Sequence, residues 1–143
     1  MLTQHEADAL IAMRKFFLTA SAISLPPGTD ETYELLGDDK RERFLLDIWR
    51  GTLRLSKLRY QTRGRAVIVL VRLDVDGAPH TNPDGTRIDG FHIHLYREGY
   101  EDKWAYPLDP SVFRDVTDIR RALEDFCRYC NVDNVPPLQG DLL

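Results

Sequence analysis

Residues 66–75 have the sequence AVIVLVRLDV, which is the most strongly strand-forming stretch of the chain. Its first six residues are all apolar and mostly β-branched, a pattern typical of a strand that is buried on both faces. Beyond residue 71 the charged residues Arg72 and Asp74 alternate with apolar ones, so only one face becomes polar. We therefore predict a central strand here, with the rest of a sheet built around it.

Two neighbouring segments predict a hairpin on the N-terminal side of this strand. Residues 44–49 and 53–61 are rich in leucine, aromatic and β-branched residues, and residues 50–51 between them suit a turn. The alternation of apolar residues slips near residues 56–57, which favours a β-bulge at that point. A shorter strand is expected over residues 33–36.

A further strand is predicted downstream, over residues 91–98. The tetrapeptide NPDG at residues 82–85 has the residue types that a type I turn prefers, so a structured loop precedes this strand. We expect another loop after it, over residues 100–110. Strand alternation sets two groups of side chains on opposite faces, Phe91, Ile93 and Leu95 on one and His92, His94 and Tyr96 on the other.

Helices are predicted near both ends of the chain. Thr3 and Glu6 have the spacing of a capping box, and the apolar residues that follow indicate a helix ending near Thr19. Asp115 is the expected N-cap of a second helix, whose apolar stripe consists of Ile119, Ala122, Leu123, Phe126, Cys127 and Cys130. The order of elements predicts a single α+β domain over residues 1–143, an antiparallel sheet of about four to five strands with an N-terminal and a C-terminal helix.

The composition is that of a folded domain outside the membrane. The chain length of 143 residues suits one domain, and 43% hydrophobic with 29% charged residues excludes a disordered chain. The longest apolar run, residues 66–71, is far shorter than the roughly 20 residues of a membrane span. Acidic residues stand where a signal peptide would be apolar, so we expect a cytoplasmic protein without membrane contact. Two cysteines exclude a disulfide scaffold.

One segment is strongly basic although the net charge of the chain is −4. Residues 50–65 hold six basic side chains and no acidic one. Such a strip on an acidic body can bind a polyanion locally. The candidate RNA-binding residues are Arg54, Lys57, Arg59 and Arg63, together with Tyr96. The alternative is a basic outer sheet face that prevents strands of other chains from pairing.

The least expected feature is the grouping of three of the four histidines, His80, His92 and His94, within 15 residues. His92 and His94 share one face of a strand, and a loop that starts and ends beside this strand carries His80. In a metal-free phosphodiesterase, a neutral imidazole accepts the 2′-hydroxyl proton of RNA and a protonated one donates to the leaving oxygen. Arg97 and Lys103 would then stabilise the phosphate.

Two other interpretations of the histidines stay open. An H-x-H pair on a strand can supply two ligands to a metal, with His80 or Asp84 as the third. Otherwise the histidines simply occupy a solvent-facing sheet surface. We expect no cofactor, because the chain has no phosphate-binding glycine loop and no second cysteine pair.

Two motifs give the chain a family resemblance. They are P-H-x-N-P-D-G, which starts at Pro79, and H-x-H-x-Y-R-E-x-Y-x-D-K-W, which starts at His92. The chain resembles a family of small uncharacterised bacterial proteins over nearly its whole length. This resemblance implies one fold unit and a bacterial or mobile-element setting, and it transfers no catalytic residue.

The leading hypothesis is a metal-independent ribonuclease, acting as a toxin or a component of a defence locus. Its predicted catalytic residues are His80, His92, His94, Arg97 and Lys103. The alternative is a non-catalytic module, antitoxin-like or inhibitor-like, that binds RNA or a protein partner from the same locus. A metal-dependent hydrolase ranks third, because an H-x-H pair alone does not establish a bound metal.

Overall fold

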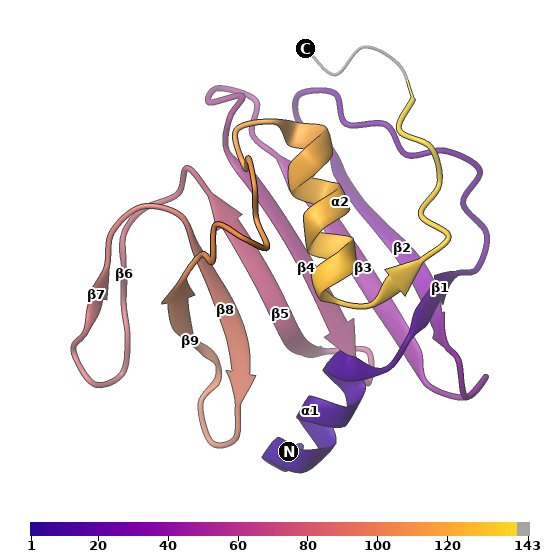
Figure 1. The fold of residues 1–143 in the computed structure, drawn as a ribbon, viewed down its shortest axis with the longest axis horizontal. Coiled ribbons are helices and arrows are strands. Elements are labelled where there is room, and N and C mark those ends of the chain that lie inside the picture. The colour runs from indigo at the N-terminus through magenta and orange to yellow at the C-terminus, as the bar shows by residue number, and fades with distance from the viewer. Residues whose placement is uncertain (140–143) are drawn as a thin grey trace.

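The computed structural model of the protein describes residues 1–139 and consists of a large twisted sheet with two helices on one of its faces (Figure 1). In this described part, eight strands make up the large sheet, in the spatial order β10-β1-β2-β3-β4-β5-β8-β9. Their bounds are β1 (Lys15–Phe17), β2 (Asp30–Gly37), β3 (Arg43–Arg50), β4 (Leu58–Gly64), β5 (Ile68–Val75), β8 (His92–Arg97), β9 (Glu101–Pro107) and β10 (Val132–Asp133). A separate small hairpin consists of β6 (His80–Thr81) and β7 (Arg87–Ile88).

The general α+β class is as expected, but the predicted sheet of about four to five strands is wrong, because residues 1–139 form eight strands in that sheet. Residues 15–17, taken as helix, form β1, and most of the loop expected over residues 100–110 is β9. β1, β9 and β10 are short or rich in polar residues. Pairing with a neighbouring strand, rather than their own sequence pattern, holds them extended.

The central strands are as predicted, with differences in their connections. β3 and β4 pair antiparallel, β5 lies between β4 and β8, and only the contact of β1 with β10 is parallel among the described strands. The hairpin turn expected at residues 50–51 is a longer loop, because Arg50 still belongs to β3 and its guanidinium donates to main-chain carbonyls. The bulge expected near residues 56–57 is also wrong, since the register of β4 shifts between Thr62 and Arg63.

The first helix, α1 (Gln4–Ala12), begins as predicted and ends earlier. The Thr3 hydroxyl accepts from the Glu6 amide at 3.1 Å, and the Glu6 carboxylate accepts from the Thr3 amide at 3.1 Å, which completes the capping box. The predicted end near Thr19 is wrong, because the chain leaves the helix to pair with β2 as β1.

The second helix, α2 (Ile119–Tyr129), packs its apolar stripe against the sheet as predicted. The buried members of the stripe are Ala122, Leu123, Phe126, Cys127 and, at the C-cap, Cys130. The N-cap is Asp118, whose carboxylate accepts from amides of the first turn. The predicted cap, Asp115, lies outside the helix and accepts from Thr117. Neither helix within residues 1–139 is long and apolar enough to cross a membrane.

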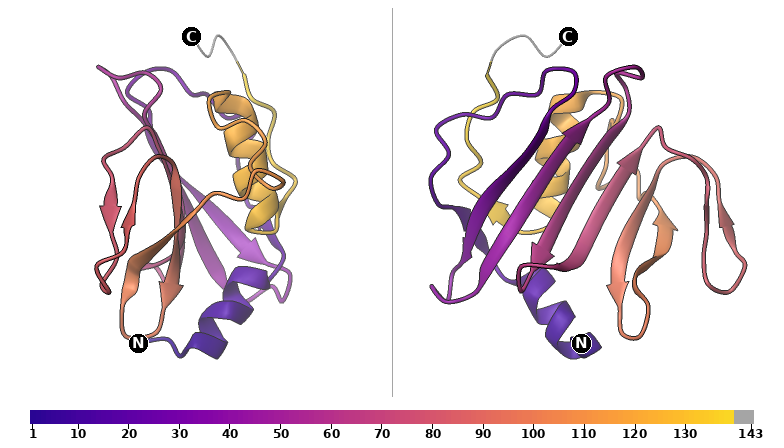
Figure 2. Two further views of the ribbon diagram at one scale, coloured as in Figure 1. Left: turned by 60° about the vertical axis from the view of Figure 1, so that its left-hand side comes forward. Right: turned by 180° about the vertical axis from the view of Figure 1, so that it is seen from behind.

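The two faces of the sheet differ in what covers them (Figure 2). The helices pack on one face, and the β6–β7 hairpin lies on the side of the other. On β5, Leu73 is buried in the core, whereas Arg72 and Asp74 belong to the opposite, open face. Because Arg72 pairs with His94 and Asp74 with His92 across the β5–β8 ladder, both histidines lie on the open face as well.

Candidate functional site

Three imidazoles meet beneath the β6–β7 hairpin. His92 and His94 come from β8, and His80 comes from β6. Their ring centroids are 4.6 Å apart for His80 and His94, 5.0 Å for His92 and His94, and 5.8 Å for His80 and His92. The turn predicted at residues 82–85 closes the hairpin, with the Gly85 amide donating to the carbonyl of Asn82 at 2.9 Å. The structure thus brings the three predicted histidines together.

The carboxylate of Asp74 lies among these rings. Its Oδ2 is 3.6 Å from Nε2 of His92 and 3.4 Å from Nε2 of His94. Its Oδ1 is 3.3 Å from Nε of Arg59 and 3.3 Å from Nε of Arg72. Burial acts to raise the pKa of the Asp74 carboxyl, but the contacts with the His92 imidazole and two guanidiniums outweigh burial and hold that pKa well below its usual range. Asp74 is therefore ionised.

The protonation of His94 follows from its two partners. Nδ1 lies 2.8 Å from the carbonyl oxygen of Asp102, which can only accept, so Nδ1 carries a proton. Nε2 lies 3.1 Å from Nη2 of Arg72, nearer than to Asp74, and a guanidinium can only donate. His94 is thus neutral, and the Arg72 guanidinium donates to the lone pair of its Nε2.

His92 has different partners. Its Nδ1 donates to the carbonyl oxygen of Gly90 at 3.0 Å, and its Nε2 faces the Asp74 carboxylate. The contact with the Asp74 carboxylate raises the pKa of His92 above the ordinary value of 6.5, although burial acts to lower it. The surroundings of His92 therefore favour the protonated imidazole, whereas those of His94 favour the neutral one.

His80 is the accessible member of the cluster. His92 and His94 are 2% and 1% exposed, whereas His80 is only partly buried. Nε2 of His80 donates to the carbonyl oxygen of Lys103 at 2.8 Å. Over residues 1–139, Nδ1 of His80 has no hydrogen-bond partner, so this nitrogen keeps a free lone pair in the neutral ring.

A small pocket of about 200 Å³ adjoins these rings. Besides the three histidines and Asp74, the residues that line it include Trp49, Lys57, Arg59 and Arg72. The ammonium of Lys57 lies 5.9 Å from the centroid of the Trp49 ring. Three cationic side chains and a planar aromatic ring form a lining that suits a phosphate and a stacked base.

The distances within part of the cluster would also fit a metal ion. One ligand atom each from Asp74, His92 and His94 lies within 4.8 Å of the others. Both strand histidines also have Nδ1 fixed by a carbonyl, as metal-binding histidines do. The charges oppose a dication, because Arg72 donates into the His94 nitrogen that would bind it and Arg59 contacts the carboxylate. The donor set therefore favours a metal-free cluster.

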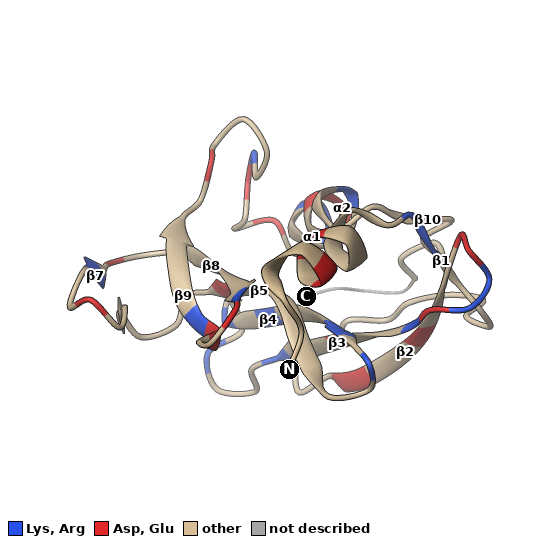
Figure 3. Ribbon diagram, turned by 90° about the horizontal axis from the view of Figure 1, so that it is seen from below, with Lys and Arg blue, Asp and Glu red and all other residues tan. Residues whose placement is uncertain are grey.

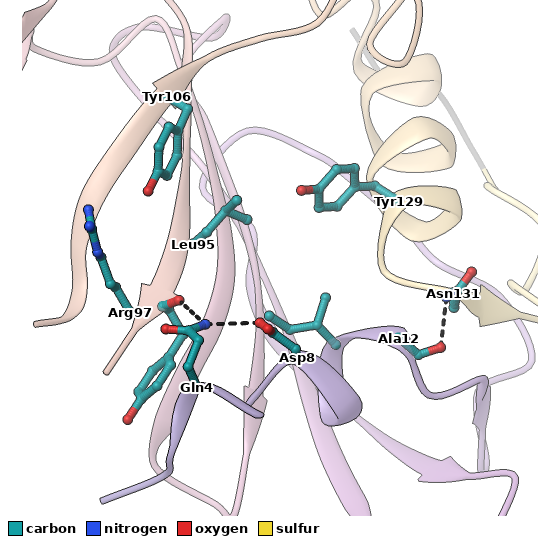
Figure 4. A pocket seen from close by; sticks show the side chains of 10 residues that line it. Gln4, Asp8, Ala12, Leu95, Arg97, Tyr106, Tyr129 and Asn131 are labelled. Carbon is teal, nitrogen blue, oxygen red and sulfur yellow. Dashed lines mark hydrogen bonds between the residues drawn. The ribbon is translucent and has the colours of Figure 1, made fainter. Parts of the chain in front are cut away.

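The structure separates Arg97 from the histidines. Its guanidinium lies over the Trp104 ring, 4.2 Å from the centroid, and Arg97 lines a different cavity of about 610 Å³ between α1, β8, β9 and the end of α2 (Figure 4). Lys103 offers its main-chain carbonyl to His80, while its side chain is exposed. Neither Arg97 nor Lys103 is among the described residues that line the histidine pocket.

Tyr96 also lies away from the histidines, and the prediction that it shares their face is wrong. The register of β8 against β9 shifts between Leu95 and Arg97, which interrupts the alternation of side chains. The Tyr96 hydroxyl donates to the carbonyl oxygen of Leu2 at 2.6 Å, and the residue is 4% exposed. Its ring is therefore part of the core beneath α1.

The predicted basic strip is matched by acidic residues from neighbouring segments, and Figure 3 shows both charges interspersed along the sheet. Lys57 and Arg59 line the histidine pocket. Arg54 and Arg63 are not among the described residues that line it. The ion pairs of the strip include Arg54–Asp76 at 3.6 Å, Arg59–Asp74 at 3.3 Å and Arg63–Asp47 at 2.7 Å. RNA binding by these residues stays a prediction.

Sequence reasoning does not find three residues of the pocket, Trp49, Arg72 and Asp74. The alternation of Arg72 and Asp74 with apolar residues marks a polar face of one strand, which is the signal that the sequence contains. That this face adjoins the histidines follows only from the register of β5 against β8.

Comparison with known proteins identifies the family. The model of a family of unknown function (DUF6978) matches residues 2–132. The chain belongs to this family. The match covers every residue of the histidine pocket, and the description of DUF6978 assigns no activity. No curated protein and no solved structure matches the chain. For this member of DUF6978, function has to be argued from the site itself.

Proposed function

We propose that the protein is a metal-independent ribonuclease that uses His80 as general base and His92 as general acid. The observation that carries the proposal is a free nitrogen on His80 beside His92, whose pKa the Asp74 carboxylate raises, with ring centroids 5.8 Å apart at one pocket. General acid–base catalysis needs one group of each kind within reach of the reacting phosphorus. Histidine serves both roles near neutral pH.

The reaction moves two protons: one is removed from the attacking oxygen and one is added to the leaving oxygen. Nδ1 of His80 accepts the proton of an RNA 2′-hydroxyl while that oxygen attacks the adjacent phosphorus. The bond from phosphorus to the 5′-oxygen breaks, and Nε2 of His92, which faces Asp74 before the substrate binds, gives its proton to this leaving oxygen, so the leaving oxygen has to enter beside Asp74. The products are a 2′,3′-cyclic phosphate and a 5′-hydroxyl end, and water restores the two imidazoles to their starting states.

The other residues of the pocket support these roles. Asp74 favours the protonated form of His92, and Arg59, whose side chain is 52% exposed, can contact a phosphate oxygen while it stays beside Asp74. Lys57 adds a second cation, and the ring of Trp49 offers a stacking surface for an unpaired base. We therefore propose single-stranded RNA as the substrate class.

Cleavage of a fluorescently labelled RNA oligonucleotide in the presence of EDTA tests the proposal. We expect the wild type to cleave, and His80→Ala and His92→Gln to lose about 10²–10⁴-fold in rate. His5→Ala is the matched control, because His5 is exposed on α1 and should keep the full rate. An oligonucleotide with 2′-deoxyribose throughout should resist, since it lacks the attacking oxygen.

Three results would overturn the proposal. They are a wild type that cleaves no RNA, a His80→Ala variant that cleaves like the wild type, and equal cleavage of the deoxyribose oligonucleotide. Cleavage that EDTA abolishes and zinc or manganese restores would instead support a metal-dependent hydrolase.

The burial of His92 and His94 favours a second candidate, a non-catalytic module that binds RNA or a protein partner. Both rings have both nitrogens engaged within the protein, which also suits a structural polar network. Fluorescence anisotropy with a 2′-O-methyl RNA, which cannot be cut, separates the two candidates. Tight binding without cleavage of ordinary RNA identifies the binding module, and copurification with a protein from the same locus would identify a toxin–antitoxin or defence pairing.

A further inference from the structure

Side chains of the β6–β7 hairpin, rather than another strand, cover the outer edge of β9. β9 is the last strand of the sheet, so alternate residues direct their amide and carbonyl groups away from β8. The Ala105 amide donates to Oδ1 of Asn82 at 2.8 Å, and Nδ2 of Asn82 donates to the Ala105 carbonyl at 3.0 Å. Two positions earlier, the carbonyl of Lys103 accepts from His80.

The side chain of Asn82 takes the place of a strand residue. A residue on a neighbouring strand would offer one donor and one acceptor to Ala105, and a carboxamide offers the same two groups. Asn82 is 6% exposed, so both hydrogen bonds are shielded from water. The hairpin is therefore fastened to β9 through a single buried side chain and the neighbouring His80.

The turn itself does not require an asparagine here. At the first position of a type I turn, Asn, Asp or Ser side chains commonly bond to the backbone of the turn. In this hairpin, main-chain bonds close the turn, from the Gly85 amide to Asn82 at 2.9 Å and from the Asn82 amide to Thr86 at 2.8 Å. The Asn82 carboxamide instead bonds to both the amide and the carbonyl of Ala105.

We infer that Asn82 is a positioning residue, which docks the hairpin on β9 and so holds His80 over the pocket. His80 lies two residues before Asn82, and its bond to Lys103 fixes the ring with Nδ1 free. The catalytic consequence rests on the proposed ribonuclease function. The docking is a property of the fold and can be measured without RNA.

Amide hydrogen exchange and ¹⁵N NMR of the full chain test the docking. In Asn82→Ala we expect exchange of the Ala105 amide to become about tenfold faster or more, because its acceptor is lost. The His80 ring nitrogens should change from one fixed tautomer to the mixture of a free histidine. Thr81→Ala is the control, because Thr81 is an exposed neighbour in β6 and should change neither measurement.

Two further measurements keep the docking testable even if Asn82→Ala fails to fold. Asn82→Asp keeps an acceptor for the Ala105 amide but sets a carboxylate against the Ala105 carbonyl, so repulsion should undock the hairpin and speed Ala105 exchange without removal of the acceptor. In the wild type itself, a side-chain amide proton of Asn82 should exchange far more slowly than those of an exposed asparagine. An Asn82 side chain that exchanges rapidly in the wild type would overturn the inference.

RNA cleavage then tests the positioning role. We expect Asn82→Ala to lower kcat about tenfold or more while KM stays within about twofold, because the pocket's RNA-binding cations remain. Faster Ala105 exchange with unchanged kcat would overturn the positioning role and leave the docking intact. A wild type without cleavage refutes the proposed function, and the exchange data still decide whether Asn82 docks the hairpin.

Discussion

Replacing Asp74 with asparagine should lower the free energy of unfolding by about 3 kcal/mol at pH 7. The Asp74 side chain is 14% exposed and faces the guanidiniums of Arg59 and Arg72 and the ring of His92. Removing one partner of a buried charge pair costs about 3–5 kcal/mol, because the remaining charges lose their compensation. The lower end applies here, since the Arg59 side chain is 52% exposed and can turn to water.

Urea unfolding at pH 7 measures this loss. With a slope of about 2 kcal/mol/M, a loss of about 3 kcal/mol moves the midpoint by about 1.5 M. Asp89→Asn is the control, because the Arg87–Asp89 side chains are 64% and 74% exposed and their pair should contribute little. An Asp74→Asn midpoint within about 0.3 M of the wild type would refute the argument that Asp74 anchors the cluster.

The same substitution should change the pH dependence of stability. The folded pKa of Asp74 lies below the 3.8 of an unperturbed aspartate, so its contribution is present above pH 3.8 and is lost as the pH falls toward the folded value. The gap in unfolding free energy between wild type and Asp74→Asn should therefore narrow in acid. NMR titration should also show the pKa of His92 falling toward 6.5 in the variant.

Other parts of the structure give three further predictions. Because the pKa of His92 is raised in the folded protein, its charged form stabilises the fold fully below pH 6.5, and this contribution is lost as the pH rises through the folded pKa. The free energies of unfolding in urea of wild type and His92→Gln should therefore converge with rising pH. Burial raises the pKa of Cys130 from 9.0 to about 12 and leaves the residue 1% exposed, so an aromatic disulfide reagent should modify this thiol far more slowly in the native protein than in the unfolded chain. Thr3→Ala should cost about 1 kcal/mol in urea unfolding, and Thr3→Ser should restore it. Comparable losses in both Thr3 variants would contradict the capping role.

Rules that involve nearby residues predicted much of the fold. The capping box at Thr3, the turn at residues 82–85 and the central strand within residues 66–75 each depend on residues a few positions apart. β1 and β9 did not follow from such rules, because β1 is extended by pairing with β2 and β10, and β9 by pairing with β8. Helix-like spacing of apolar residues continued past Ala12 and concealed β1.

The residues of the site also fall into those that nearby-residue rules predict and those that they do not. The H-x-H spacing sets His92 and His94 on one face of a strand, so their proximity was predictable. The role of Asp74 was not, because it depends on the register of β5 against β8. The ion pairs of the strip over residues 50–65 were not predictable for the same reason, since acids such as Asp47 reach it from another strand.

The parallel pairing of β1 with β10 links the order of folding to the order of synthesis. Lys15 lies opposite Val132, so this part of the sheet cannot close until nearly all of the described chain has been made. Contacts between such distant residues form slowly, because the long intervening segment must first be ordered. During translation one edge of β1 therefore lacks its partner strand, and association between nascent chains competes with correct folding throughout that interval.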